Sequence, residues 1–184
     1  ALHDSEAKFR TFFEKSNTPY TLTVHPSAER TYQYSYNQAF ADLVKDTVFF
    51  EGDLSSLAGM HLAVQTVTHP EDFAEHKRQF AEVSAGKSDH IRLEKRYLNR
   101  DGSIIWALLN VAFLHDDAGN ITLSIATIQD ITQRKHAEQA RAASESKFRA
   151  FFHDSTVPHF MIGYTDDTRA NIYLETNATF DALF

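Results

Sequence analysis

A segment of fifteen residues that occurs twice constrains this chain more than any other feature of its sequence. Residues 5–19, SEAKFRTFFEKSNTP, return as residues 144–158, SESKFRAFFHDSTVP, with nine identities in fifteen positions. With a shift of one residue, the match continues from Asn37, Phe40 and Leu43 to Asn177, Phe180 and Leu183. A domain usually takes about 100–200 residues. The 184 residues therefore predict one complete domain followed by the opening part of a second of the same kind.

The composition excludes several classes of chemistry. The chain has no cysteine, which excludes disulfides, thiolate zinc sites, iron–sulfur clusters and a cysteine nucleophile. A net charge of −7, from 18 Lys and Arg against 25 Asp and Glu, argues against nucleic-acid binding. No apolar run approaches the roughly 18–20 residues of a membrane span. We therefore expect a cytoplasmic piece of a longer protein, with neither membrane contact nor nucleic acid as partner.

The hydrophobic periodicity predicts an order of helices and strands. Helices are expected at 5–16, at 37–45 with Asn37 as N-cap, from Asp53 to about Gly59, from His69 to Gly86, and from Ile131 to about Asp154. Alternating residues predict strands at 20–25, 31–36, 89–99, 104–115 and 121–130. Two strands, a run of helices and a meander of three strands describe an α+β fold on one antiparallel sheet.

Five short motifs carry a resemblance to a known family. They are NQAF at 37–40, HPED at 69–72, YLNRDGSIIW at 97–106, DDAGN at 116–120 and IQDITQRK at 128–135. Together they resemble the PAS domain, of the PAS/PAC sensor family, over about residues 5–135. Residues 144–184 resemble the start of a second copy. The resemblance implies the PAS fold, a five-stranded antiparallel sheet with helices on one face, here with an N-terminal helix and a long C-terminal connector helix.

The resemblance also implies a division of the chain and a role. The expected parts are an N-terminal flanking helix (1–17), a PAS domain (18–131), a signalling helix (132–153) and the truncated start of a second PAS domain (154–184). PAS domains are sensory and dimerisation modules of multidomain signalling proteins such as histidine kinases and diguanylate cyclases. We therefore expect a homodimer, no catalytic residues here and an output domain in the same polypeptide. The signal is expected to leave at Asp130, Thr132 and Arg134, where either Asp130 or Thr132 caps the exit helix.

Strand alternation and the resemblance to flavin-binding members predict a pocket between the sheet and the helices. Its expected walls are Phe40, Leu43, Met60, Phe73, Phe80, Lys95, Tyr97, Ala107, Leu109, Val111, Ala126 and Ile128. Two interpretations stay open: these residues pack into a dry core, or they enclose a small-molecule ligand. Lys95 is unusual on such a face. It either reaches solvent by snorkelling or a bulge, or supplies a cation to a carboxylate ligand.

The opposite face of the sheet carries apolar residues that a monomer would not leave exposed, among them Trp106, Leu108 and Ile125. The expected cover is the stripe on the first helix formed by Phe9, Phe12 and Phe13. This helix can come from the same chain or from a dimer partner, and both interpretations stay open.

No haem, flavin or metal is predicted. Asp72 and His76 stand one helical turn apart, a spacing that can ligate a metal, but we expect His76 to be a surface histidine. The predicted function is a sensor that relays a small-ligand or conformational signal. The alternatives are a ligand-free scaffold for dimerisation, and a haem or flavin sensor of redox state or gas.

Overall fold

The computed structural model of the protein describes residues 2–28, 31–163 and 173–183. The chain forms two compact units, residues 1–133 and 134–184.

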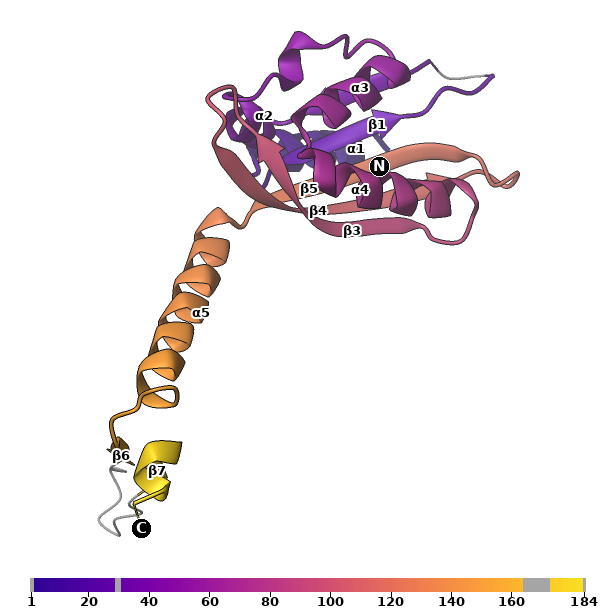
Figure 1. The fold of residues 1–184 in the computed structure, drawn as a ribbon. Coiled ribbons are helices and arrows are strands. Elements are labelled where there is room, and N and C mark those ends of the chain that lie inside the picture. Colours follow the sequence, from indigo (N-terminus) through magenta and orange to yellow (C-terminus); the bar gives the residue numbers. More distant parts are fainter. Residues whose placement is uncertain (1, 29–30, 164–172, 184) are drawn as a thin grey trace. The chain divides into compact units, whose positions relative to one another are not determined.

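The first unit is built on one five-stranded antiparallel sheet with the strand order β2-β1-β5-β4-β3 (Figure 1). The strands are β1 (Tyr20–Val24), β2 (Gln33–Tyr36), β3 (His90–Leu98), β4 (Ile104–His115) and β5 (Ile121–Asp130). The turns between the three long strands contain Gly102 at φ +82° and Gly119 at φ +84°, a conformation that favours glycine. The predicted α+β class and five-stranded sheet are confirmed.

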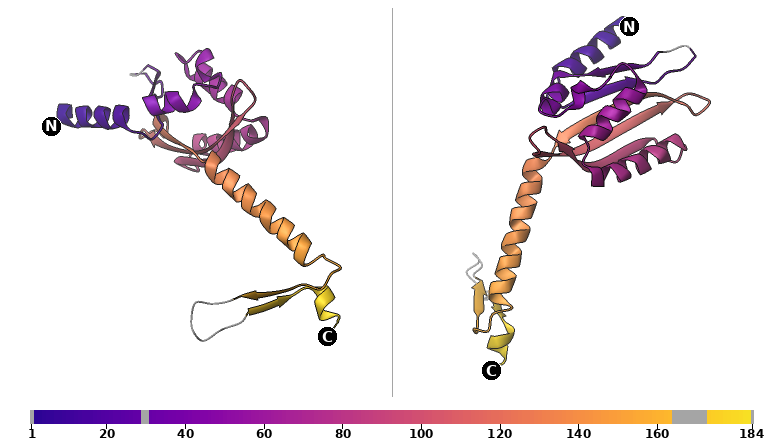
Figure 2. Two further views of the ribbon diagram at one scale, coloured as in Figure 1. Left: turned by 90° about the vertical axis from the view of Figure 1, so that its left-hand side faces the viewer. Right: turned by 45° about the horizontal axis from the view of Figure 1, so that its top comes forward.

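Three helices and a short 3-10 helix lie on one face of this sheet (Figure 1). They are α2 (Gln38–Val44), η1 (Phe49–Glu51), α3 (Leu57–Val67) and α4 (Pro70–Ser84). Helix α4 begins as predicted, with proline in its first turn and acidic residues at the positive end of the helix dipole, and Gly86 follows it at φ +68°. Helix α1 (Leu2–Lys15) instead projects away from the sheet (Figure 2).

The helix expected from Asp53 to about Gly59 is wrong. Asp53 accepts hydrogen bonds from the backbone and hydroxyl of Ser55, and Ser56 caps α3 by accepting from Gly59 N at 3.1 Å. Gly59 lies in the first turn of α3, where an added Cβ would come 1.8 Å from the Asp53 carbonyl oxygen. The glycine therefore permits two backbone segments to approach closely, and it does not end a helix.

One hydrophobic core fills the space between the helices and the inner face of the sheet. Every second residue of β3 points into it, so Ile91, Leu93, Lys95 and Tyr97 are buried. Helix α2 supplies Phe40 and Val44, one helical turn apart, on its buried face. The charged Lys95 therefore lies in the same layer as the apolar core residues.

Asn37 fastens three segments of the first unit together. Its Oδ1 accepts from Tyr20 N at 2.9 Å and from Phe40 N at 3.1 Å, so it caps α2 as predicted. The side chain is buried, so these bonds are partly or fully shielded from water. Its Nδ2 donates to the backbone oxygens of Phe13, Ser16 and Thr18.

Helix α5 (Thr132–Phe152) occupies the range in which a long helix was predicted. In the second unit it is followed by β6 (Phe160–Gly163), which pairs antiparallel with β7 (Tyr173–Thr176), and by α6 (Ala178–Asp181). Asn177 is buried there. Its Oδ1 accepts from His159 N at 2.9 Å and Phe180 N at 3.0 Å, and its Nδ2 donates to Val157 O at 2.9 Å.

The first helix does not cover the outer face of the sheet within the same chain. Helix α1 projects away from the sheet (Figure 2). Of its stripe only Phe13 is buried, against Tyr20, while the side chains of Phe9 and Phe12 remain 45% and 59% exposed. The outer-face residues Trp106, Leu108 and Ile125 are half-buried. The interpretation in which the stripe and this face meet within one chain is therefore wrong, and a dimer partner stays a prediction.

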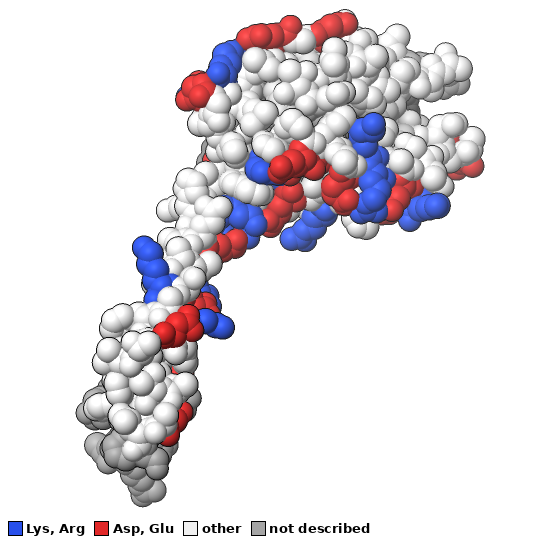
Figure 3. All heavy atoms as spheres, in the orientation of Figure 1, with Lys and Arg blue, Asp and Glu red and all other residues white. Residues whose placement is uncertain are grey.

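Charged side chains of both signs gather over α4 and β3 (Figure 3). On α4, Arg78 pairs with Glu75 and Glu82 at helical spacing. Across the described residues, no helix combines the length and apolar character needed to cross a membrane.

Candidate functional site

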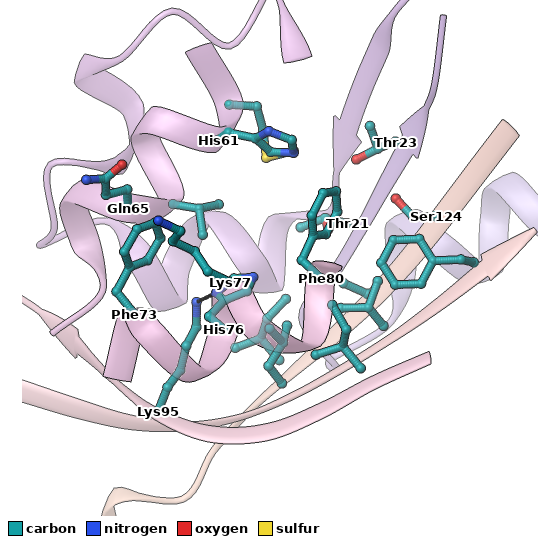
Figure 4. Close-up of a pocket in the computed structure, with 18 of the residues that line it drawn as sticks. Thr21, Thr23, His61, Gln65, Phe73, His76, Lys77, Phe80, Lys95 and Ser124 are labelled. Carbon is teal, nitrogen blue, oxygen red and sulfur yellow. Dashed lines mark hydrogen bonds between the residues drawn. The ribbon is translucent and has the colours of Figure 1, made fainter. Parts of the chain in front are cut away.

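A cavity of about 930 Å³ lies between the inner face of the sheet and helices α2, α3 and α4 (Figure 4). This volume is in the range of roughly 300–1,000 Å³ typical of small-molecule sites. Ten of the twelve residues expected to form a pocket line it: Phe40, Met60, Phe73, Phe80, Lys95, Tyr97, Leu109, Val111, Ala126 and Ile128.

The other two predicted wall residues do not line this cavity. On α2, Phe40 and Val44 are buried, whereas Leu43 packs partly buried against the core and lines a different hollow with Pro19 and Asp130. Ala107 is fully buried on the inner face and is not among the residues that line the cavity. Their assignment to the pocket is therefore wrong.

Lys95 is the most unusual residue of the cavity wall, because its side chain is completely buried. Its Nζ lies 3.1 Å from His76 Nδ1 (Figure 4). It also lies 3.0 Å from Thr68 Oγ1 and 4.6 Å from the centre of the Tyr97 ring. Thr68 in turn donates its hydroxyl proton to Val64 O, so its oxygen is an acceptor for the lysine. The expectation that Lys95 snorkels or is turned out by a bulge is wrong.

Burial controls the protonation of this cluster. It lowers the pKa of Lys95 to about 7, and the carboxylate of Asp72 opposes that change only partly. It also lowers the pKa of His76 to about 3, helped by the nearby Lys95 and His61, so His76 stays neutral at pH 7. A neutral His76 with its proton on Nε2 can accept a hydrogen bond from Lys95 at Nδ1.

The site of His76 differs from the expectation of a surface residue. It lies on the inner side of α4, where the helix packs against β3, and it lines the cavity. Its Nδ1 is bonded to Lys95. Among the described residues, no group of three or more His, Cys, Asp or Glu could hold a metal ion.

A second polar group lines the cavity on the side of β1 and β5, away from Lys95 (Figure 4). Thr21, Thr23 and Ser124 present hydroxyl groups there, and His25 Nε2 lies 3.1 Å from Ser124 Oγ. Sequence reasoning did not assign these residues to the pocket. Alternation along β1, together with the inward register of its partner β5, could have found Thr21 and Thr23.

The start of α4 is clamped to β3 next to Lys95. Asp72 accepts from Arg96 N at 2.7 Å and from Arg96 Nε and Nη2, while Glu71 accepts from Arg96 Nη2. His69 N donates to Arg96 O at 2.8 Å. These hydrogen bonds lower the pKa of Asp72 and keep it ionised.

The exit helix is joined to the sheet by short hydrogen bonds. Asp130 Oδ1 accepts from Thr132 N at 2.8 Å, so Asp130 caps the first exposed amide of α5. Thr132 Oγ1 accepts from Trp106 N at 3.0 Å, and Ile131 N donates to Trp106 O at 2.8 Å. Of the residues expected in signal transfer, Arg134 pairs with Glu138 on α5.

Residues 53–128 match the family described as PAS fold. These residues form a PAS domain. Solved structures of low sequence identity share the fold. An RNA-binding light-oxygen-voltage receptor has 16% identity and a TM-score of 0.56, covering 79% of this chain and 38% of that chain. A sensory box histidine kinase/response regulator from Burkholderia thailandensis E264 has 17% identity and a TM-score of 0.54, covering 77% and 98%.

The PAS domain is homologous to segments of two named signalling proteins. The probable diguanylate cyclase DgcE of Escherichia coli strain K12 is 37% identical over 78 residues, 42% of this chain and 7% of that protein. The sensor histidine kinase TmoS of Ectopseudomonas mendocina is 27% identical over 139 residues, 76% of this chain and 13% of that protein. The chain thus spans a small part of the length of these relatives.

Proposed function

We propose that this chain is the ligand-sensing part of a longer signalling protein of the histidine kinase or diguanylate cyclase type. The observation that carries the proposal is the cavity of about 930 Å³ on the inner face of the PAS domain, which contains a buried lysine. A dry core would have no reason to keep a cation at its centre, because burying a charge is costly. Any catalysis is assigned to an output domain in the same polypeptide.

The cavity and the exit helix are connected by one row of paired residues across strands β3, β4 and β5. Lys95 is paired with Ala107 across β3 and β4, and Ala107 is paired with Asp130 across β4 and β5. The residue of β4 that precedes Ala107 is Trp106, which makes the hydrogen bonds that hold Ile131 and Thr132. Occupancy of the cavity at Lys95 is therefore proposed to shift this row and so the start of α5.

Native mass spectrometry of the purified chain tests this function, followed by hydrogen exchange. Supporting results are a small molecule retained in the cavity, or a probe that binds it, with altered exchange at Trp106 and Thr132. Absence of any binding by a broad panel of small molecules would overturn the proposal in favour of a ligand-free dimerisation scaffold. A visible absorption band of haem or flavin would overturn it in favour of a redox or gas sensor.

We also propose that two copies associate through α1 and the outer face of the sheet. The support is that Phe9 and Phe12 on α1 are exposed, as is Leu114 on β4 at 51%. The test is light scattering of a Phe9→Ser/Phe12→Ser variant, which leaves Phe13 and its contacts in place. A fall from dimer to monomer mass is expected. An unchanged dimer, or a monomeric parent chain, contradicts this interface.

We further infer that residues 144–184 begin a second PAS domain. The repeated segment supports this, with nine identities in fifteen positions. So does the bonding of Asn177, whose Oδ1 accepts from an amide 18 residues earlier and one three residues later, much as Asn37 accepts from Tyr20 and Phe40. The test is to extend the chain to the natural continuation of this segment. A cooperative unfolding transition of its own is expected for the added domain.

A further inference from the structure

We propose that the cavity binds an organic carboxylate with an apolar body, and that Lys95 anchors the carboxylate. This rests on the proposed sensing function and narrows it to one chemical class of ligand. The inference begins from the surroundings of Lys95, which is 0% exposed. Its hydrogen-bond partners, Thr68 Oγ1 and His76 Nδ1, are both uncharged acceptors.

The described part of the protein supplies no carboxylate to this ammonium group. Asp72 is the acid whose field reaches Lys95, yet both of its oxygens are held by Arg96. A buried charge is normally paired or neutralised. A negative group that pairs with the charged form of Lys95 would therefore come from a molecule that enters the cavity.

The geometry leaves the lysine able to bind such a group. An ammonium has three N–H donors, and two of them are directed to Thr68 and His76. These two bonds orient Nζ, so that the third donor can be given to a ligand oxygen. A charge-assisted hydrogen bond of this kind is stronger than one between neutral groups.

The remaining walls determine the body of the ligand. Aromatic rings line much of the cavity, with Phe73 and Phe80 on α4 and Phe113 on β4. Apolar walls of this kind bind the apolar part of a ligand, while a few polar groups provide the specificity. The hydroxyl groups of Thr21, Thr23 and Ser124 lie on the other side (Figure 4), where they can bond to a polar substituent. The ligand class is therefore an aromatic or aliphatic acid.

The chain offers a matched control for the anchor. Lys77 is on α4 and also lines the cavity, but it is exposed and its Nζ lies 5.8 Å from the centre of the Phe73 ring. Its ammonium group is hydrated, so it gains less from a carboxylate than the buried Lys95 does. The substitutions Lys95→Met and Lys77→Met remove the same charge from the two positions.

The experiment is calorimetric titration of the full chain with phenylacetate, 4-phenylbutyrate and octanoate, each beside its neutral amide. At least one acid is expected to bind roughly tenfold or more tightly than its amide. Lys95→Met is expected to abolish this preference by weakening the acid much more than the amide, and Lys77→Met is expected to retain it. Thermal unfolding of both variants establishes that they are folded.

Each other result overturns the carboxylate assignment. If acid and amide bind equally, Lys95 does not anchor a carboxylate, although the cavity still binds a ligand. The same holds if the preference for the acid is lost only in Lys77→Met. Binding of neutral compounds alone leads to the same conclusion, and the sensing function then stands. If no acid, amide or other small molecule binds, the carboxylate proposal and the sensing function fail together.

Discussion

Lys95 and Arg96 are neighbours on β3, yet the two cations have opposite surroundings. Arg96 points to the outer side and meets two carboxylates, Glu71 and Asp72, at the start of α4. Lys95 points inward and meets only neutral acceptors. Strand alternation alone produces this separation, because successive side chains leave opposite faces.

The comparison of Arg96 with Lys95 shows which of the two cations stabilises the fold. Arg96 ties α4 to β3 through its side chain and its backbone, so it contributes to stability. Lys95 makes two hydrogen bonds, but its burial opposes the charged form. A residue that is costly to the folded state and faces a cavity is better explained by ligand binding than by architecture.

The largest expected change in stability comes from substituting Lys95. Lys95→Met fills a similar volume without charge, so it should stabilise the chain by about 2–3 kcal/mol at pH 7. Urea unfolding of the variant and the parent chain measures the difference. A destabilised Lys95→Met would break the comparison, because Lys95 would then be as structural as Arg96.

The next effect is on the acid that holds Arg96. Asp72→Ala removes the acceptor of three Arg96 donors and should cost about 2 kcal/mol of unfolding free energy. Glu71→Ala is the matched control, because Glu71 is exposed and accepts from the same guanidinium. Its cost should be much smaller. Equal losses in both variants would show that the clamp does not depend on the partly buried hydrogen bonds of Asp72.

The third effect is a dependence on pH. The folded-state pKa of Lys95, about 7, lies below the ordinary value of 10.5, so between these values the unfolded chain holds the extra proton. The unfolding free energy of the parent chain therefore rises with pH at this site. The difference in unfolding free energy between Lys95→Met and the parent should shrink by about 1 kcal/mol per pH unit between pH 7 and 9. His76 stays neutral and Asp72 stays ionised over this range, since both have lowered pKa values.

Paired urea titrations at pH 7, 8 and 9 measure this change. Taking the difference between variant and parent cancels groups that titrate equally in both chains. A constant advantage of Lys95→Met across these pH values is incompatible with a pKa near 7.

The smallest expected change in stability comes from replacing the guanidinium group of Arg96 by an ammonium group. Arg96→Lys keeps the charge but loses the fork of donors that binds Asp72 and Glu71 together. A cost of about 1 kcal/mol is expected in the same unfolding assay. No loss at all would mean that charge alone, without donor geometry, holds the start of α4.

The sequence predicted the parts of this comparison that depend on local rules. Alternation placed Lys95 inward, and proline followed by two acids predicted the start of α4. It could not predict the partners of Lys95, because Thr68 and His76 are 27 and 19 residues away and come from two different helical segments. Such contacts depend on how the helices pack on the sheet.

The errors have a similar origin. Gly59 was interpreted as a helix end, although its role is close approach to the Asp53 backbone, which no local pattern reveals. Helix α1 projects away from the sheet (Figure 2), and the end that leads to β1 is bonded to Asn37, 24 residues further along the chain. Ten of the twelve predicted wall residues nevertheless line the cavity, because alternation and helical period act within each element.

The hydrogen bonds of Asn37 have a practical consequence for anyone who shortens this protein. A chain trimmed to begin at β1 retains every strand but removes the carbonyl oxygens of Phe13, Ser16 and Thr18, the acceptors of a buried amide. The amide would then face water or remain unsatisfied, and the cap of α2 would loosen with it. The smallest stable piece of the first unit therefore starts before Phe13, within the last turn of α1.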